Sequence, residues 1–545
     1  LSPPPELSKE QPRCNVLKVD NSEFLPSIDD NESLRNNFIF HVMEVLTKYL
    51  PFLSNFHMPP YIDHPHVKEF SVKSDYRILD LLDKSENKSD EMIDILQYVH
   101  QFIPQTTATQ SKNVLERLVF GGDQLTNERA YQSQIDMINA SCESDRLKGI
   151  VHRPEGLHLC MNFMKQIFDV FYSTSSVGDS CSLHNLKVLL DRRDLKLDIT
   201  NGYNSMRNLV NDVLDGHIIA GAMHYFGMEK LDDPPTQNRP SPILPHSMET
   251  DFLLKVATYI VDSFVFSHEE NLAQALSDVE RNQEQLQALD DGYYHCNFEH
   301  CNKKYKTSGW LKYHLKKQHS VLVEGVAPVR KEEDSQYDGQ YNYASSLMKV
   351  SLLYRDTADA FKMGDGNRLF RNLKFLLLHF DVGHQIKYRL WCWRMLAYEK
   401  VVLSEYESYA YRHNISMNIV GGVRNCVAND NLVEINVHRV KELMRAMGAN
   451  LSYPAARRAA KCADIVKSLT EKFASKTSGK HSSSKVESDV KAVAEQLVQG
   501  SILIHTPGRE HATFPNFSRD LLDKVNLLQL SEWLTKQKLR ASLEM

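Results

Sequence analysis

The sequence lacks the features of secreted, membrane-embedded and nucleic-acid-coating proteins. Nine cysteines are spread over 545 residues, too thinly for a disulfide-rich scaffold. No apolar run approaches the roughly 18–20 residues that a membrane-spanning helix requires. The net charge of −6 argues against a chain that coats nucleic acid over its whole surface. We therefore expect a protein of the nucleus or cytosol, neither secreted nor in a membrane.

Two further absences concern the chain as a whole. It does not begin with methionine, so we expect a fragment whose targeting signals, if any, precede Leu1. No internal repeat is found. A hydrophobic content of 42% and a charged content of 25% are ordinary for globular proteins. The length suffices for two to four domains with proper cores.

One motif stands out between Tyr294 and His319, where the residues match a two-Cys, two-His zinc finger. Zinc favours four sulfur or nitrogen ligands in a tetrahedron, and a hairpin Cys pair facing a helical His pair supplies them. So short a segment cannot fold alone, so bound zinc supplies its folding energy. A chance arrangement of Cys and His residues is given little weight, because the core positions of a zinc finger match as well as the four ligand positions. The predicted ligands are Cys296, Cys301, His314 and His319, around the core residues Tyr305 and Leu311.

The finger stands alone and lacks the side chains that read bases most specifically. The positions that normally face bases hold Thr307, Trp310 and Tyr313. None makes the bidentate contacts of arginine to guanine or asparagine to adenine. The finger's lysines could hold phosphates, and the two aromatic rings could stack on bases or pack against protein. We expect weak, largely non-specific nucleic-acid contact, or docking onto the protein's own body. An ordinary transcription factor is disfavoured.

Positive charge is concentrated in two places. Residues 439–485 contain 11 lysines and arginines against three acids, and the finger is also lysine-rich. Two basic patches on an acidic background are suited to local phosphate contact. Two solvated helical faces would give the same composition, and this alternative stays open.

The pattern of apolar residues predicts an α+β protein that is mostly helical. Short strands are expected at 15–19 and 117–120, and core helices at 155–173 and 203–227. The expected segments are a disordered N-terminal segment (1–12), the N-terminal part of the core (13–230), a Pro-rich connector (231–250), an acidic helical segment (251–292), the finger (293–320), a linker (321–344), the C-terminal part of the core (345–475), a flexible spacer (476–485) and a helical tail (486–545).

Three acids are candidates for catalysis, although each has a plainer explanation. Asp20 and Asp123 follow the two predicted strands, where turn residues are common. Glu434 opens a helical pattern, where an acid is favoured by the helix dipole. His158 and His217 lie in apolar helical stretches and are interpreted as core histidines, with His158 as a weaker candidate partner of Asp123.

The same segments resemble an uncharacterised domain of transposon-derived proteins, common in invertebrates and fungi. The likeness covers most of residues 15–475, and Gly122–Thr126 is among its most specific parts. The matching pieces are Asp20-Asn21, Gly122–Thr126, Gly156–Phe163, His217–Ala220, Phe375–Leu377, Lys387-Tyr388, Glu434, Lys441 and Gly448–Asn450. The resemblance implies an RNase H-like core with large helical insertions and an inserted ββα finger.

The resemblance also implies a transposase site in which Asp20, Asp123 and Glu434 form an Asp-Asp-Glu triad. Such a site holds two divalent ions, Mg²⁺ or Mn²⁺, for polynucleotidyl transfer or cleavage. The chain departs from the family pattern at Ser22-Glu23 and at Val437-His438, which fits a host-domesticated copy with decayed chemistry. The rival hypothesis is a non-catalytic interaction scaffold whose finger and acidic helix bind protein.

Overall fold

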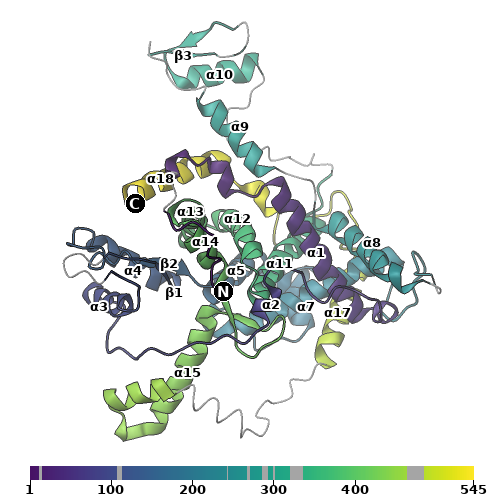
Figure 1. The fold of residues 1–545 in the computed structure, drawn as a ribbon. Coiled ribbons are helices and arrows are strands. Elements are labelled where there is room, and N and C mark those ends of the chain that lie inside the picture. The colour runs from purple at the N-terminus through teal and green to yellow at the C-terminus, as the bar shows by residue number, and fades with distance from the viewer. Residues whose placement is uncertain are drawn as a thin grey trace.

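The computed structural model describes residues 1–10, 15–106, 113–241, 244–266, 271–284, 292–296, 298, 301–319, 336–462 and 484–544. Helices dominate these residues, and the strands among them form three two-stranded sheets. The prediction of a mostly helical α+β protein is confirmed. Figure 1 shows a broad helical body from which the finger projects beyond a connecting helix.

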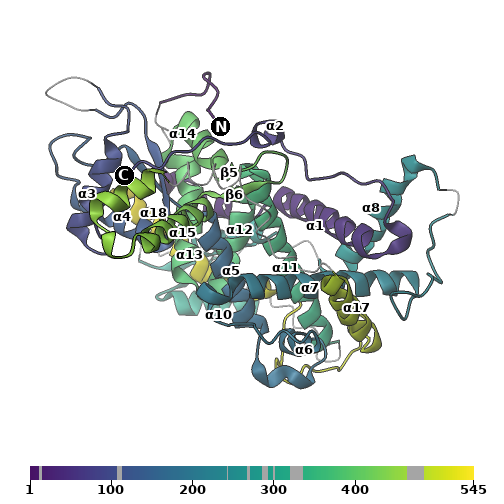
Figure 2. The same cartoon turned by 90° about the horizontal axis from the view of Figure 1, so that it is seen from below.

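Long helices make up the centre of the body. They are α1 (Ile28–Tyr49), α5 (Gly156–Phe171), α7 (Ile199–Phe226), α8 (His246–Phe264), α11 (Gly339–Met363), α12 (Gly366–Val382), α13 (Ile386–Ala397) and α17 (Ser484–Gln499). Apolar residues at helical spacing give each a buried face, and these faces meet in one hydrophobic core. α17 lies along α7, and α8 lies along α1 (Figure 2). The helices predicted at 155–173 and 203–227 are confirmed as α5 and α7.

Shorter elements surround this centre. The α-helices are α2 (Val67–Phe70), α3 (Ser89–His100), α4 (Gln124–Asp136), α6 (Leu183–Leu189), α9 (Leu272–Glu284), α10 (Ser308–Gln318), α14 (Glu405–His413), α15 (Asn429–Met447) and α18 (Leu527–Glu544). The single turns are η1 (Val16–Lys18), η2 (Asn21–Phe24), η3 (Pro51–Leu53), η4 (Thr174–Gly178), η5 (Tyr398–Val402, a π-turn), η6 (Gly448–Asn450) and η7 (Leu521–Lys524). Residues 453–462 are helical as well.

The sheet that matters for the candidate acids consists of two parallel strands joined through α4. β1 (Leu118–Gly122) pairs with β2 (Ile150–Pro154) in the register Leu118 to Ile150. β1 confirms the strand predicted at 117–120. Because the strands are parallel, their carboxyl ends lie at the same edge of the sheet. The other two sheets are antiparallel hairpins, β3 (Tyr294–His295) with β4 (Lys304–Tyr305) and β5 (Ser416–Asn418) with β6 (Cys426–Ala428).

The strand predicted at 15–19 is wrong, because this segment forms the 3₁₀ turn η1. Val16 and Val19 are buried, whereas Leu17 is 43% exposed. Burial three residues apart matches a helical turn rather than the alternation of a strand. The β-branched composition gave a strand signal, but η1 packs against the helix α18.

The terminal segments belong to the body. The Leu1 ammonium group donates to Asn414 Oδ1 at 2.6 Å, so residues at the beginning of the chain reach the end of α14. α17, inside the predicted tail, contributes Val493 and Leu497 to the main core. α11 begins at Gly339, within the predicted linker 321–344. Residues 321–335 of this linker and residues 476–483 of the predicted spacer lie outside the described residues.

A buried polar network crosses the core beneath α1 and α12. The fully buried carboxylate of Asp356 accepts hydrogen bonds from Arg368 (3.2 Å), Asn372 (2.8 Å) and Asn37 (3.3 Å), and it lies 3.1 Å from His41 Nε2. Buried charge is tolerated only when it is paired and hydrogen-bonded, and these partners come from α1 and α12. The network therefore ties the two helices to α11.

Candidate functional site

The four predicted zinc ligands converge on one point. Their ligand atoms all lie within 4.8 Å of one another. Cys296 Sγ lies 3.4 Å from His319 Nε2, Cys301 Sγ 3.2 Å from His314 Nε2, and the two Nε2 atoms are 3.2 Å apart. Bonds of about 2.0–2.3 Å to one central zinc would place tetrahedral ligands roughly 3.3–3.8 Å apart. The group could hold a metal ion, and two thiolates with two imidazoles are typical of a structural zinc site.

The local sequence builds this geometry from a hairpin and a helix. The Cys296 amide donates to the carbonyl of Lys303 at 2.8 Å, which closes the hairpin, and α10 carries His314 with His319 as its C-cap. Leu311 and Leu315 are buried against Cys296 in a small cluster separate from the main core. A core of this size cannot stabilise a fold alone, so the metal is expected to be its main source of stability.

One face of α10 is left open. Trp310 is 62% exposed and Tyr313 is 53% exposed, and their rings meet edge to face at 5.9 Å. Lys317 Nζ donates to the Tyr313 hydroxyl at 3.1 Å, so a cation lies beside the aromatic pair. These rings lie at positions predicted to face bases. They do not pack against the described part of the body, so docking of this face onto the protein's own body is not seen.

Asp123 lies at the carboxyl end of β1, where it caps α4. Its Oδ1 accepts from the backbone N–H of Thr126 at 2.7 Å. Glu155 lies at the carboxyl end of β2, and it is buried so close to Gly121 that a Cβ there would collide with its carboxylate. Burial raises the pKa of Glu155, while the neighbouring Arg153 opposes the shift. The sheet edge therefore carries two acids, only one of which the sequence indicated.

Asp430, at the beginning of α15, was also missed. Its carboxylate accepts from the backbone N–H groups of Leu157 (2.8 Å) and His158 (3.0 Å) and lies 2.9 Å from His158 Nδ1. It therefore caps α5 from another helix. Asp430 and Glu434 are four residues apart, a spacing that places both on one helix face and could have marked Asp430 in the sequence.

The structure brings some of the predicted acids together. The hydrogen bond that His158 makes to the Asp430 carboxylate raises the pKa of His158, and the charges of Asp123 and Glu434 act in the same direction, so both acids lie near enough to act on this histidine. Asp20 is exposed at the beginning of η2, which packs against α9. Among the described residues, the Cys and His ligands form the one group with metal-binding spacing. Asp20, Asp123 and Glu434 form no such group here.

His217 agrees with its predicted core role, and the two tryptophans of α13 are buried as well. His217 is fully buried, its Nδ1 lies 2.8 Å from the Val213 carbonyl, and burial lowers its pKa to about 4. Trp391 and Trp393 are each 2% exposed.

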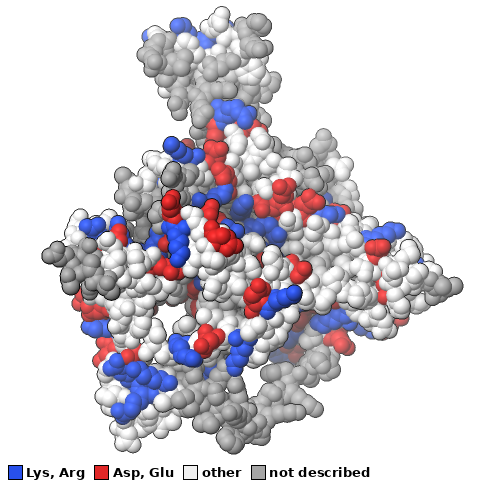
Figure 3. Space-filling view, viewed as in Figure 1, with Lys and Arg blue, Asp and Glu red and all other residues white. Residues whose placement is uncertain are grey.

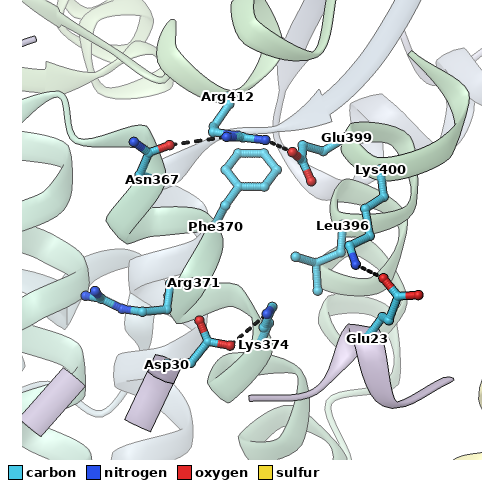
Figure 4. A pocket seen from close by; sticks show the side chains of 10 residues that line it. All are labelled: Glu23, Asp30, Asn367, Phe370, Arg371, Lys374, Leu396, Glu399, Lys400 and Arg412. Carbon is cyan, nitrogen blue, oxygen red and sulfur yellow. Dashed lines mark hydrogen bonds and ion pairs between the residues drawn. The ribbon is translucent and has the colours of Figure 1, made fainter. Parts of the chain in front are cut away.

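A small pocket of about 200 Å³ lies between α1, α12 and α13 (Figure 4). It is rich in charge, but its cations already have partners. Lys374 pairs with Asp30 at 2.7 Å, Lys400 pairs with Glu23, and Arg412 pairs with Glu399. In Figure 4 the Arg371 guanidinium points away from the opening. The first pair fastens α1 to α12, the second fastens η2 to η5, and the third joins α14 to η5, so little charge is left for a ligand.

A basic surface covers α15 and residues 453–462. Figure 3 shows lysine and arginine side chains gathered there. Its exposed cations are Lys441, Arg445, Arg457, Arg458 and Lys461. Two of them, Arg457 and Lys461, pair with Asp80, which leaves the others facing solvent. We refer to these five residues as the α15 basic surface.

No described helix is both long and apolar enough to cross a membrane.

Comparison with known proteins gives one family match. No curated protein and no solved structure matches the chain. One family model matches residues 18–485, which include the finger, both parallel strands, α5 and α15. The chain therefore belongs to the family of unknown function DUF6589.

Proposed function

We propose that this chain is a transposase-derived, domesticated nuclear protein that binds zinc and associates with nucleic acid through its finger and its α15 basic surface. The observation that carries the proposal is the exposure of Trp310 and Tyr313 on a metal-stabilised module, beside Lys317. Exposed aromatic side chains stack on bases with little regard to sequence, and lysines hold phosphates.

The α15 basic surface supports the same proposal. Lys441, Arg445 and Arg458 are exposed on an overall acidic chain. Local positive charge of this kind contacts phosphates without reading sequence. Together with the finger, it would give non-specific and salt-sensitive binding. The rival function, a protein-interaction scaffold, would use the same exposed rings, and nucleic-acid binding separates the two.

The finger face is tested by Trp310→Ala with Tyr313→Ala. Loss of one stacked ring costs about 1–3 kcal/mol, so we expect affinity for a short DNA to fall roughly tenfold or more in fluorescence anisotropy. Val188→Ala with Leu189→Ala, which shortens two exposed apolar side chains on α6, is the matched control. Unchanged affinity in the finger variant would remove this face from the binding surface. If the unaltered protein binds no nucleic acid, the scaffold function replaces the proposal.

A second candidate function is strand cleavage or joining at an RNase H-like core. It is favoured by the position of Asp123 at the end of a parallel strand, where its charge and that of Glu434 from α15 both help to raise the pKa of His158. The resemblance adds Asp20 to this proposed catalytic set. Carboxylate oxygens suit Mg²⁺ or Mn²⁺. The donors do not fit a two-ion site as they lie, because Asp20, Asp123 and Glu434 form no group with metal-binding spacing among the described residues, and the Asp430 oxygens are engaged in capping α5. We derive no reaction step from them.

This second function makes a separate prediction. Supercoiled DNA incubated with Mn²⁺ should be nicked by the unaltered protein and left intact by Asp123→Asn. Asp136→Asn, at the other end of α4, is the control for loss of one carboxylate. Equal nicking by Asp123→Asn and the unaltered protein would exclude Asp123 as a metal ligand, and no nicking by either would leave the non-catalytic function alone.

A further inference from the structure

A wide groove lies between α4 and α13. Tyr131 and Gln134 of α4, Trp393 and Arg394 of α13 and Arg540 of α18 line it. Its volume is about 1130 Å³. Sites for small ligands usually measure about 300–1,000 Å³, so the size favours an extended ligand. We refer to this feature as the α4–α13 groove.

Positive charge prevails in the α4–α13 groove. Arg146, Arg394 and Arg540 line it, and none has a carboxylate within ion-pair distance among the described residues. Arg146 uses its Nε on the Ala140 carbonyl at 2.7 Å, which leaves its charge unpaired. Free guanidinium groups in a cavity are suited to an anionic ligand, since each offers a planar set of donors.

The acids of the groove wall do not cancel this charge. Glu407 accepts two hydrogen bonds from Arg117, at 2.5 and 2.6 Å. Glu143 accepts from the Val114 backbone at 3.1 Å and lies 3.9 Å from Lys148. Each of these two carboxylates therefore has its own cation. Glu116 also lines the groove, and the three arginines outnumber this remaining acid.

Arg394 is held rigidly by two aromatic rings. Its guanidinium lies 4.3 Å from the centre of the Tyr131 ring and 5.0 Å from the Trp391 ring. A cation fixed over aromatic faces keeps its charge and loses little further freedom when it meets a ligand. The charge of Arg394 also helps burial to lower the pKa of His152 to about 3, so that histidine stays neutral behind the groove.

A buried donor in the wall lacks an acceptor. Trp393 is 2% exposed and lines the groove, and its Nε1–H has no hydrogen-bond partner among the described residues. A buried polar group without a partner costs about 1–3 kcal/mol, so such groups call for an explanation. An acceptor on a bound molecule would satisfy this N–H.

We infer that the α4–α13 groove binds a single strand of nucleic acid, an inference that rests on the proposed function and names its substrate class. Unpaired arginines would meet phosphates, and the partly exposed rings of Tyr131 and Tyr398, with the flat guanidinium of Arg394, provide stacking surfaces for bases. An acidic peptide would satisfy the charge but would make no use of the stacking surfaces.

The groove also leads toward the candidate acids. Tyr388, near the beginning of α13, lies close enough to Asp123 and Asp430 for their charges to act with burial in raising its pKa. Arg394 lies six residues further along the same helix, which is about 9 Å at 1.5 Å per residue. The groove and the candidate acids are therefore less than two helical turns apart along α13.

The test uses a triple variant that carries Arg146→Gln, Arg394→Gln and Arg540→Gln in one chain. It is compared with the unaltered protein. Binding of a fluorescent oligo-dT is measured over a salt series. We expect at least tenfold weaker binding, and a plot of log affinity against log salt that is less steep by about 2, since each lost phosphate contact removes about 0.7. The control, Lys84→Gln with Lys165→Gln and Arg193→Gln, removes three exposed cations outside the groove.

A second measurement does not depend on the variant folding. Photo-crosslinking of the unaltered protein to an iodouracil-substituted single strand should label residues of α13 or α18. An unchanged salt slope, or crosslinks confined to the finger and α15, would overturn the groove inference and leave the proposed function standing. Displacement of the strand by polyglutamate at equal affinity would assign the groove to an acidic protein. Absence of any nucleic-acid binding would defeat both proposals.

Discussion

The Cys296→Ser variant is expected to lose one zinc ion per chain and to unfold residues 293–320, while the main melting transition stays in place. The four ligands share one centre, and the finger's own core consists of little more than Cys296, Leu311 and Leu315. Zinc binding contributes about 10–16 kcal/mol in isolated fingers, far more than this core can supply. Metal analysis and hydrogen exchange of the finger peptides measure the loss, and calorimetry follows the body.

Cys142→Ser is the matched control, because Cys142 is a partly exposed free cysteine outside the finger. It should retain the zinc ion. Collapse of the whole protein in Cys296→Ser would contradict the account, since it would make the finger a support of the body. Retention of zinc with an ordered finger would show that Cys296 is not a ligand.

Asp356→Ala is expected to lower the free energy of unfolding by about 3–5 kcal/mol. The substitution leaves the buried guanidinium of Arg368 short of a counter-ion, and breaking a buried ion pair from one side has this cost. Urea denaturation measures the change. Asp169→Ala, which breaks an exposed pair with Lys165, should cost about 1 kcal/mol or less. Equal effects would mean that the buried network does not stabilise the core.

The same network sets a pH dependence of stability. Burial tends to raise the pKa of Asp356, but the charge of Arg368 and the hydrogen bond from His41 hold it below 3.8. Burial also tends to raise the pKa of Glu44. Its hydrogen bonds with His41 and Arg424 outweigh this effect and lower the pKa to about 2. Both folded-state pKa values are depressed, so the stability is present above about pH 4.5 and is lost as pH falls toward 2. Glu44→Gln should show a smaller loss between pH 5 and 3.

Features that depend on local spacing could be predicted from the sequence. The finger needs ligands and core residues at fixed intervals, and the structure confirms the convergence of Cys296, Cys301, His314 and His319. α5 and α7 were predictable for the same reason, because their apolar residues recur at the helical period over several turns. β1 is bounded by glycines and was also found.

Features that depend on distant partners could not be predicted in the same way. Residues 15–19 form a turn because of what packs against them, and Asp430 caps a helix that begins 274 residues earlier. The groove arginines are separated by more than a hundred residues, and only the packing of α4, α13 and α18 brings them to one cavity. The residues next to each of these positions in the sequence do not indicate which distant residues it will contact in the fold.

Binding of the unaltered chain to DNA, measured by anisotropy over a salt series with and without zinc chelation, tests the central claim most directly. The account predicts binding that weakens steadily as salt rises, and a further loss when chelation unfolds the finger. No binding to single- or double-stranded DNA even at low salt, with zinc present at one ion per chain, would contradict it.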